Sequence, residues 1–269
     1  MLNKYENVSS LEVCVEKGKE GSYISKNFYS APITITSPFE TENEGCMLIV
    51  MSSSPGLMEG DVQKHKIEVK ENAKFVLTTQ SFEKVHKSFE HPSKKDVEIK
   101  VFKNGYCKYV PQPVIPYGDS RYVCEFNVFL ENETAKCTIV DILTCGRADM
   151  GEKFKYKYFK VKTEAFQNDE LIYSENINFE PDKFEMENFM MYEGYTHLAN
   201  MLFFNLNIDD EKIQKVRKLF ESENFKGGVT KTGHGDIVVK VFGTNGYELV
   251  ELSEKIIDIF EPEDYRSSF

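Results

Sequence analysis

Apolar and polar residues alternate along most of the first two-thirds of the chain. Ile67 and Val69 are separated by one polar residue, as are Val97, Ile99 and Val101, and this period of two continues from about residue 30 to residue 180. Side chains on a strand point alternately to opposite faces, so the spacing predicts strands with one buried and one wetter face. We therefore expect residues 1–206 to be rich in strands.

Polar clusters between the alternating runs predict the turns. Asn104 and Gly105 tolerate positive φ angles and separate the runs 97–102 and 106–110, so we expect a tight β-hairpin at this point. Further connections are expected at residues 131–133 and 167–169, where Asn, Asp, Glu and Gln gather.

The period changes after residue 208. Acidic residues at 209–211 precede Ile213, Val216, Leu219 and Phe220, which fall on one helical face, so we expect a helix over 209–224. The two glycines at 227 and 228 are expected to end that segment. A short strand over 236–242 and a second amphipathic helix over 247–260 complete a helix–strand–helix region, 207–262. No repeat of fixed period and no low-complexity linker interrupts the chain, which favours one domain over 1–269.

Composition restricts the partners. The chain has 269 residues, 44 of them acidic and 33 basic, with a formal charge of -11. An acidic surface repels phosphate backbones and anionic lipids, so nucleic acid and membrane partners are disfavoured, whereas a cation or a basic protein is permitted. The polar first ten residues predict no secretory signal, and the six cysteines form no C-x-x-C pair. We expect a cytoplasmic protein with reduced, buried thiols.

The sequence carries none of the familiar catalytic motifs. It has no G-x-x-x-x-G-K-[ST] loop, no G-x-S-x-G elbow and no H-E-x-x-H pair. Its five histidines are dispersed, and His234 lies between glycines that are typical of a turn. No metal ligand can be assigned from these patterns.

Four stretches carry polar residues in patterns that go beyond ordinary turns. They are Pro55 to Asp61, Thr78 to Val85, Pro111 to Tyr117, and Asp141 to Phe154. Each stretch alone fits a satisfied polar turn, because Gly and Pro punctuate every β-protein.

Together and in this order, the stretches resemble the UreD family of urease accessory proteins, also called UreH. The residues that carry the resemblance are Gly60-Asp61, Thr78-Thr79-Gln80 with Lys84-Val85, Pro111-Gln112 with Ile115, and Gly146-Arg147 with Gly151-Glu152 and Phe154. The register holds from about residue 29 to residue 179 and continues more weakly through residues 238–243. Pro55, His86 and the tail 261–269 depart from the family pattern.

The resemblance implies a mostly-β fold of stacked antiparallel or mixed sheets, β-helix-like or sandwich-like, with two helices near the C-terminus. It implies a non-enzymatic scaffold that binds a UreF-type protein, through it a UreG-type GTPase, and apo-urease. It also implies that nickel passes in transit through an internal polar passage and that no cofactor is bound tightly. The site residues that we carry over or place near the motifs are Asp61, Thr79, Gln80, Arg147, Glu152 and Glu164.

These residues have different expected roles. We expect Arg147 and Glu152 to hold the glycine-bearing corner between two strands, because a planar guanidinium can bind a carboxylate or neighbouring carbonyls. Asp61, Glu152 and Glu164 are candidate carboxylates for the nickel passage. The alternative for Asp61 is that it caps its own turn.

Two other functions compete with the scaffold. A β-sandwich enzyme or small-ligand binder would gather Asp61, Arg147 and Glu152 in one concave pocket. A purely structural, oligomer-forming domain would leave urease activity independent of the protein. A scaffold should instead present an apolar surface that a partner covers.

Overall fold

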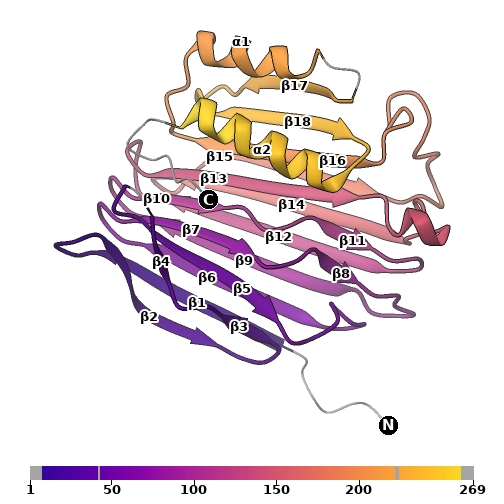
Figure 1. Ribbon diagram of the computed structural model, residues 1–269, viewed down its shortest axis with the longest axis horizontal. Helices are drawn as coiled ribbons and strands as arrows, with labels where there is room; N and C mark the ends of the chain where they lie inside the picture. The colour runs from indigo at the N-terminus through magenta and orange to yellow at the C-terminus, as the bar shows by residue number, and fades with distance from the viewer. Residues whose placement is uncertain (1–7, 42, 222–223, 262–269) are drawn as a thin grey trace.

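The computed structural model describes residues 8–41, 43–221 and 224–261, which form two stacked β-sheets with helices on one outer face (Figure 1). In spatial order, sheet A contains β15 (Glu170–Phe179), β14 (Tyr158–Gln167), β12 (Arg121–Leu130), β9 (Ser93–Val101), β6 (Val62–Val69), β1 (Val8–Lys17) and β2 (Ser22–Tyr29). The main path of sheet B contains β17 (Lys226–Lys231), β18 (Ile237–Gly243), β16 (His197–Phe204), β13 (Lys136–Thr144), β10 (Tyr106–Tyr109), β7 (Lys74–Thr79), β5 (Cys46–Ser52) and β3 (Ile33–Ile35). The short strands β4 (Phe39–Glu40), β8 (Glu83–Val85) and β11 (Val114–Pro116) join sheet B beside this path.

Successive strands in the middle of the chain change sheets. The chain passes from β5 in sheet B to β6 in sheet A and back to β7, and the same exchange repeats through β9, β10, β12, β13 and β14. Strands that follow one another within a sheet are parallel there, as in β6–β9–β12–β14 and in β5–β7–β10–β13. This winding confirms the mostly-β prediction and corresponds to its β-helix-like form.

Antiparallel pairs close the outer parts of both sheets. β2 pairs with β1, β15 with β14, and the series β13–β16–β18–β17 is antiparallel throughout. The connection expected at residues 167–169 joins β14 to β15, with φ of 49° at Asn168 and 63° at Asp169. Two successive positive φ angles are the geometry of a two-residue hairpin turn whose twist matches that of the strands.

The hairpin expected at Asn104-Gly105 is wrong. The turn itself is present, since Asn104 has a φ of 55°. However, β9 before it lies in sheet A and β10 after it lies in sheet B, and the two strands do not pair with each other. A corner between stacked sheets needs the same tolerant residues as a hairpin, so composition alone could not separate the two.

The C-terminal region packs on the outer face of sheet B. Helix α1 (Asp210–Leu219) begins after Asp209, whose carboxylate accepts a hydrogen bond from the Lys212 amide at 2.8 Å, and it is shorter than the predicted 209–224. Helix α2 (Gly246–Phe260) agrees with the predicted 247–260. Residues 222–223, inside the predicted first helix, lie outside the described residues.

The glycines at 227 and 228 correct a second expectation. They do not end the first helix but lie in β17, an edge strand that pairs with β18. The described part of this region is therefore helix–strand–strand–helix. An edge strand tolerates glycine because it has few side-chain contacts to lose.

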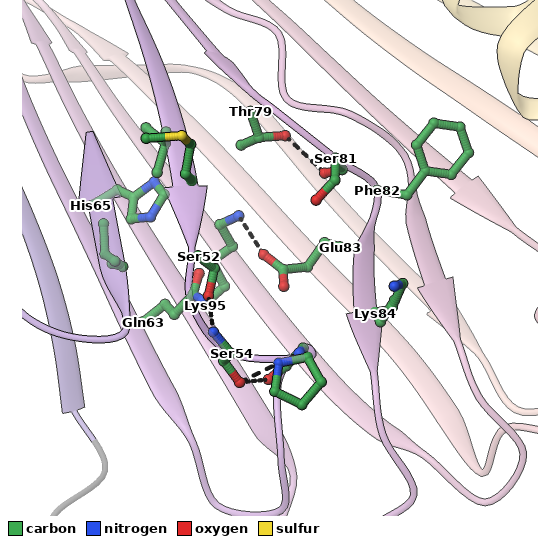
Figure 2. A pocket seen from close by; sticks show the side chains of 15 residues that line it. Ser52, Ser54, Gln63, His65, Thr79, Ser81, Phe82, Glu83, Lys84 and Lys95 are labelled. Carbon is green, nitrogen blue, oxygen red and sulfur yellow. Dashed lines mark hydrogen bonds and ion pairs between the residues drawn. The ribbon is translucent and has the colours of Figure 1, made fainter. Parts of the chain in front are cut away.

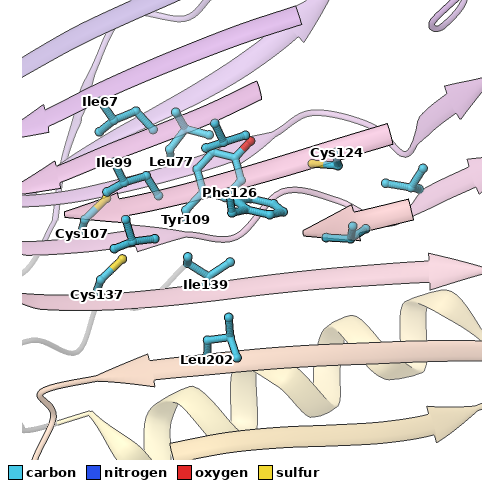
Figure 3. Packing of buried hydrophobic residues seen from close by; sticks show 14 of the residues in the cluster. Ile67, Leu77, Ile99, Cys107, Tyr109, Cys124, Phe126, Cys137, Ile139 and Leu202 are labelled. Atoms are coloured by element: carbon cyan, nitrogen blue, oxygen red, sulfur yellow. The ribbon is translucent and has the colours of Figure 1, made fainter. Parts of the chain in front are cut away.

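Two apolar clusters stabilise the stack. One fills the space between the sheets, where Ile67, Ile99, Phe126, Cys137 and Leu202 pack together (Figure 3). The other lies between sheet B and the two helices.

Five of the six cysteines are buried and Cys14 is partly exposed, which confirms the expected burial of most thiols. Among the described residues, no helix is both long enough and apolar enough to span a bilayer.

Candidate functional site

The inward-facing positions of sheet A change from apolar to polar toward one end of the stack. On β6 the buried residues run from Ile67 to His65 and Gln63, and on β9 they run from Ile99 to Lys95. The parallel register places Gln63 directly beside Lys95. One end of the inter-sheet core is therefore lined by groups that form hydrogen bonds or carry charge.

These groups border a small cavity of about 90 Å³, which is open to solvent where the exposed residues Ser52 and Pro55 line it (Figure 2). Lys95 is only 5% exposed, and its ammonium nitrogen lies 3.7 Å from a carboxylate oxygen of Glu83 on β8. Figure 2 shows these two charged groups directed toward one another. The hydroxyl-bearing residues Ser52, Ser54 and Thr79 line the same cavity. The cavity thus combines two lysines, Lys84 and Lys95, with one carboxylate and several neutral hydrogen-bonding groups.

His65 contributes an imidazole to this cavity. Its Nδ1 lies 3.1 Å from the hydroxyl of Tyr109, and its Nε2 is buried with no hydrogen-bond partner among the described residues. Burial and the nearby Lys95 ammonium lower the pKa of His65 well below its usual value, so the ring is neutral at physiological pH. A neutral ring with one nitrogen held by a hydroxyl leaves the other nitrogen available to a ligand or to water.

A second set of inward-facing polar residues crosses both sheets beyond the cavity. On sheet B, Asp141, Asn200 and Lys240 lie side by side on β13, β16 and β18. From sheet A, Glu175 on β15 accepts a hydrogen bond from Asn200 at 2.7 Å and pairs with the Lys240 ammonium. The Lys240 side chain is 43% exposed, so this row connects the interior with solvent.

Electrostatic interactions couple the two polar sets. Burial raises the pKa of Asp141 to about 6, Lys95 opposes this shift, and Glu175 adds to it. Burial alone would lower the pKa of Lys95, but Tyr109 and Glu83 help to raise it above its ordinary value. The Lys95 ammonium therefore interacts electrostatically with Glu83 at the cavity and with Asp141 in the second polar set.

The sequence contained a signal for these residues. Lys95 falls in phase with the apolar residues Val97 and Ile99, and Asp141 falls in phase with Ile139 and Leu143. A charged residue in phase with the buried face of an alternating strand is expected to point inward. Turn motifs do not indicate their inward direction, because both residues lie within strands.

Of the predicted site residues, Arg147 and Glu152 meet directly. The Arg147 guanidinium donates hydrogen bonds to both Glu152 oxygens, at 2.8 Å for the Nε contact, and it stacks 3.8 Å from the centre of the Tyr117 ring. Glu152 also accepts from the Gly118 amide at 3.0 Å, and the hydrogen bonds from Arg147 lower its carboxyl pKa. Gly146 has a φ of 107°, and a Cβ there would lie 2.5 Å from the Glu152 carbonyl oxygen. The corner is a tightly fitted turn.

Asp61 and Glu164 lie apart from that corner. The Asp61 carboxylate accepts a hydrogen bond from the Met58 amide at 2.7 Å, while the Asp61 amide donates to the Met58 carbonyl. Asp61 therefore caps its own turn, as in the alternative considered above. Glu164 alternates with the inward-facing Thr163 and Ala165, so it lies on the outer face of sheet A, 2.8 Å from Lys162.

Thr79 and Gln80 lie where β7 ends. The Thr79 hydroxyl accepts a hydrogen bond from the Gln112 amide at 2.9 Å and donates to the Ser81 carbonyl. Gln80 is exposed, and its amide donates to the Val50 carbonyl. The fold thus brings the Thr-Thr-Gln and Pro-Gln motifs into contact.

The polar cluster required by the enzyme alternative is not assembled. Arg147 and Glu152 line a surface depression together with Tyr117, Asp119 and Lys157, and Asp61 is not among the described residues that line it. Both charged groups of the corner already bind each other, which leaves neither free for acid–base chemistry.

Comparison with known proteins gives one consistent result. The family described as UreD urease accessory protein matches residues 8–268. The chain is 28% identical over 256 residues to the urease accessory protein UreH of Helicobacter pylori strain G27, covering 95% of this chain and 96% of that protein. It is 29% identical over 261 residues to the urease accessory protein UreD of Acetivibrio thermocellus, covering 96% of this chain and 99% of that protein. The chain is 28% identical over 261 residues to the urease accessory protein UreD of Flavobacterium johnsoniae, covering 95% of this chain and 91% of that protein.

Proposed function

The chain belongs to the UreD family of urease accessory proteins, and from this premise we propose that it is a non-enzymatic scaffold for nickel delivery during urease assembly. In this role it binds a UreF-type protein, through that protein a UreG-type GTPase, and apo-urease. The observation that carries the proposal is the family match, which spans nearly the whole chain. The missing phosphate-binding loop agrees with GTP hydrolysis taking place in a partner.

The interior polar residues support a route for nickel as cargo. Ni²⁺ accepts carboxylate, imidazole and water ligands, and the space between the sheets offers Glu83, Asp141, Glu175 and the neutral imidazole of His65. Asp61, Glu152 and Glu164 are held in their own turn, in the Arg147 corner and on an outer face. We therefore assign the passage to the inward-facing carboxylates in place of those three.

Lys95 explains why such a route would bind nickel only in passing. Its ammonium lies 3.7 Å from Glu83 and acts electrostatically on Asp141. An arriving cation must compete with this internal positive charge, so no carboxylate is free to hold the metal tightly. A transfer protein requires this property, because the ion has to leave for urease.

Assembly with the partners is tested by co-expression. The chain, produced together with its own UreF-type and UreG-type proteins, should elute with both from a size-exclusion column, and omission of the UreF-type protein should release the GTPase. A chain that elutes alone in the presence of its UreF-type protein would refute the scaffold.

The nickel route is tested by matched variants. Asp141→Asn should leave the partner complex intact but lower the nickel content of urease activated with it. Glu164→Gln is the control, because this carboxylate lies on the outer face of sheet A. Equal nickel loading with both variants would remove the support for an interior route through Asp141.

A further inference from the structure

A groove lies between helix α2 and the outer face of sheet B. Its volume is about 290 Å³, and its lining is mostly apolar. Helix α2 contributes Val250 and Ile257 to one wall, β13 contributes Val140 and Ile142, and β5 contributes Ile49. Val250 and Ile49 remain partly exposed, so this apolar surface is open to solvent.

Two of the sequence motifs meet at the end of this groove. Thr78 donates a hydrogen bond to the Val110 carbonyl at 2.9 Å, and Thr79 accepts one from the Gln112 amide, also at 2.9 Å. These bonds fix the Pro-Gln loop against the end of β7, and the side chains of Gln80 and Gln112 lie at the groove.

The groove adjoins the cavity that Lys95 and Glu83 line. Thr79 lines both, so the end of β7 is the boundary between them. A molecule seated in the groove would therefore lie beside the cavity that contains Glu83 and Lys95.

The charge of the groove has one sign. Glu254 is the one charged side chain among the described residues that line it. Glu251 and Asp258 are also exposed on α2, at spacings of three and four residues from Glu254. Burial raises the pKa of Glu254, and the neighbouring Asp258 and Glu251 raise it further. Carboxylates at these helical spacings repel one another, so a cation placed among them would be stabilising.

These features restrict the occupant. An open apolar groove favours an apolar anchor, and an acidic rim favours a basic neighbour. A second copy of this chain is disfavoured, because it carries 44 acidic against 33 basic residues. We propose that the groove docks a segment of a partner protein that inserts an apolar side chain between α2 and β7 and places a Lys or Arg beside Glu254. The inference rests on the proposed function, in which the direct partner of the chain is the UreF-type protein.

The test uses the full chain and its purified UreF-type protein as the probe. Glu254→Lys reverses an exposed charge at the groove, and Glu133→Lys makes the same change on the exposed turn between β12 and β13. Glu254→Lys should weaken binding by about tenfold or more, because it places like charges together in the interface, and the loss should shrink at high salt. Glu133→Lys should bind like the wild-type chain.

Hydrogen exchange gives a second readout that needs no variant. On binding, the backbone amides of residues 78–80, 110, 112 and 250–257 should exchange more slowly. Wild-type binding that survives Glu254→Lys and leaves these amides unprotected would overturn the groove while leaving the scaffold function intact. Absence of any binding by the wild-type chain would refute the scaffold function, and the groove inference with it.

Discussion

The end of helix α2 is anchored by a buried ion pair whose removal should destabilise the protein strongly. Glu261 is 0% exposed and Lys108, on β10, is 1% exposed, with 2.8 Å between the ammonium nitrogen and one carboxylate oxygen. The Tyr106 hydroxyl also donates to Glu261 and lies 2.9 Å from the Thr138 hydroxyl. The Glu261 amide continues the helix by donating to the Ile257 carbonyl. One side chain thus ties the helix to sheet B.

The magnitude follows from this burial. Removal of one partner of a buried ion pair costs about 3–5 kcal/mol, because the remaining group stays in a poorly solvated site. The free energy of unfolding of a folded domain is about 5–15 kcal/mol, so Glu261→Ala should remove a fifth or more of the stability. Replacement of both charges by apolar residues of similar volume is often neutral, so Lys108→Met/Glu261→Met should recover most of the loss.

Urea unfolding followed by circular dichroism measures these differences. With a slope of about 3 kcal/mol per molar urea, Glu261→Ala should lower the midpoint by about 1 M or more. Glu164→Ala is the matched control, since its partner Lys162 is half exposed and such pairs contribute about 1 kcal/mol or less. The reasoning fails if Glu261→Ala and Glu164→Ala shift the midpoint equally, or if the double variant is no more stable than Glu261→Ala.

Three further changes test other parts of the structure. Arg147→Ala removes two hydrogen bonds to Glu152 and the stacking on Tyr117, so soluble yield and partner binding should fall together; a loss of urease activation alone, with yield and binding intact, would contradict this structural role. The pKa of Asp141 is about 6 in the folded protein and about 3.9 in the unfolded chain. The contribution of Asp141 to the stability of the folded state is therefore complete below about pH 4 and is lost as the pH rises through 6. Asp141→Asn should therefore raise the free energy of unfolding near pH 7.5 by up to about 3 kcal/mol, while urease activation falls. Urea unfolding at about pH 5 and pH 7.5 measures this, and the same pH dependence for the wild type and Asp141→Asn would refute it. Of the six thiols only Cys14 is partly exposed, so native protein should react with iodoacetamide at that residue and unfolded protein at all six. Mass spectrometry measures the number of alkylated cysteines in each state.

Much of the fold could be predicted because the patterns that define it are local. The period of two marked the central strands, and the stripe of Leu249, Leu252, Ile256 and Phe260 fixed α2 to within one residue. The first helix was predicted too long because the glycines at 227 and 228 are typical of a helix end, whereas the helix ends at Leu219 with Phe220 as its C-cap. The glycines that seemed to follow it belong to an edge strand, where pairing with β18 outweighs their low strand propensity.

The candidate site was only partly predictable. Arg147 and Glu152 were expected together because they flank one short corner, and the structure places them in direct contact. Asp61 and Glu164 were chosen for their carboxylates near motifs, but their positions depend on a turn hydrogen bond and on strand phase. The proximity of residues to a motif in sequence says little about which side of a sheet they occupy.

The interior row could not be read from one strand at a time. Alternation shows that Asp141 faces inward on its own strand, but not that Asn200 and Lys240 lie beside it, because β13, β16 and β18 are joined through antiparallel pairs between distant segments. The Asn104-Gly105 corner has the same origin: the local sequence specifies a reversal, and the apolar faces of both sheets decide which sheet the chain enters. Because the chain alternates between the two sheets, the inward-facing side chains of successive strands all point into the space between the sheets. A few polar residues in the same phase, tens of residues apart, then become neighbours, and this alone gives an otherwise apolar stack a charged interior.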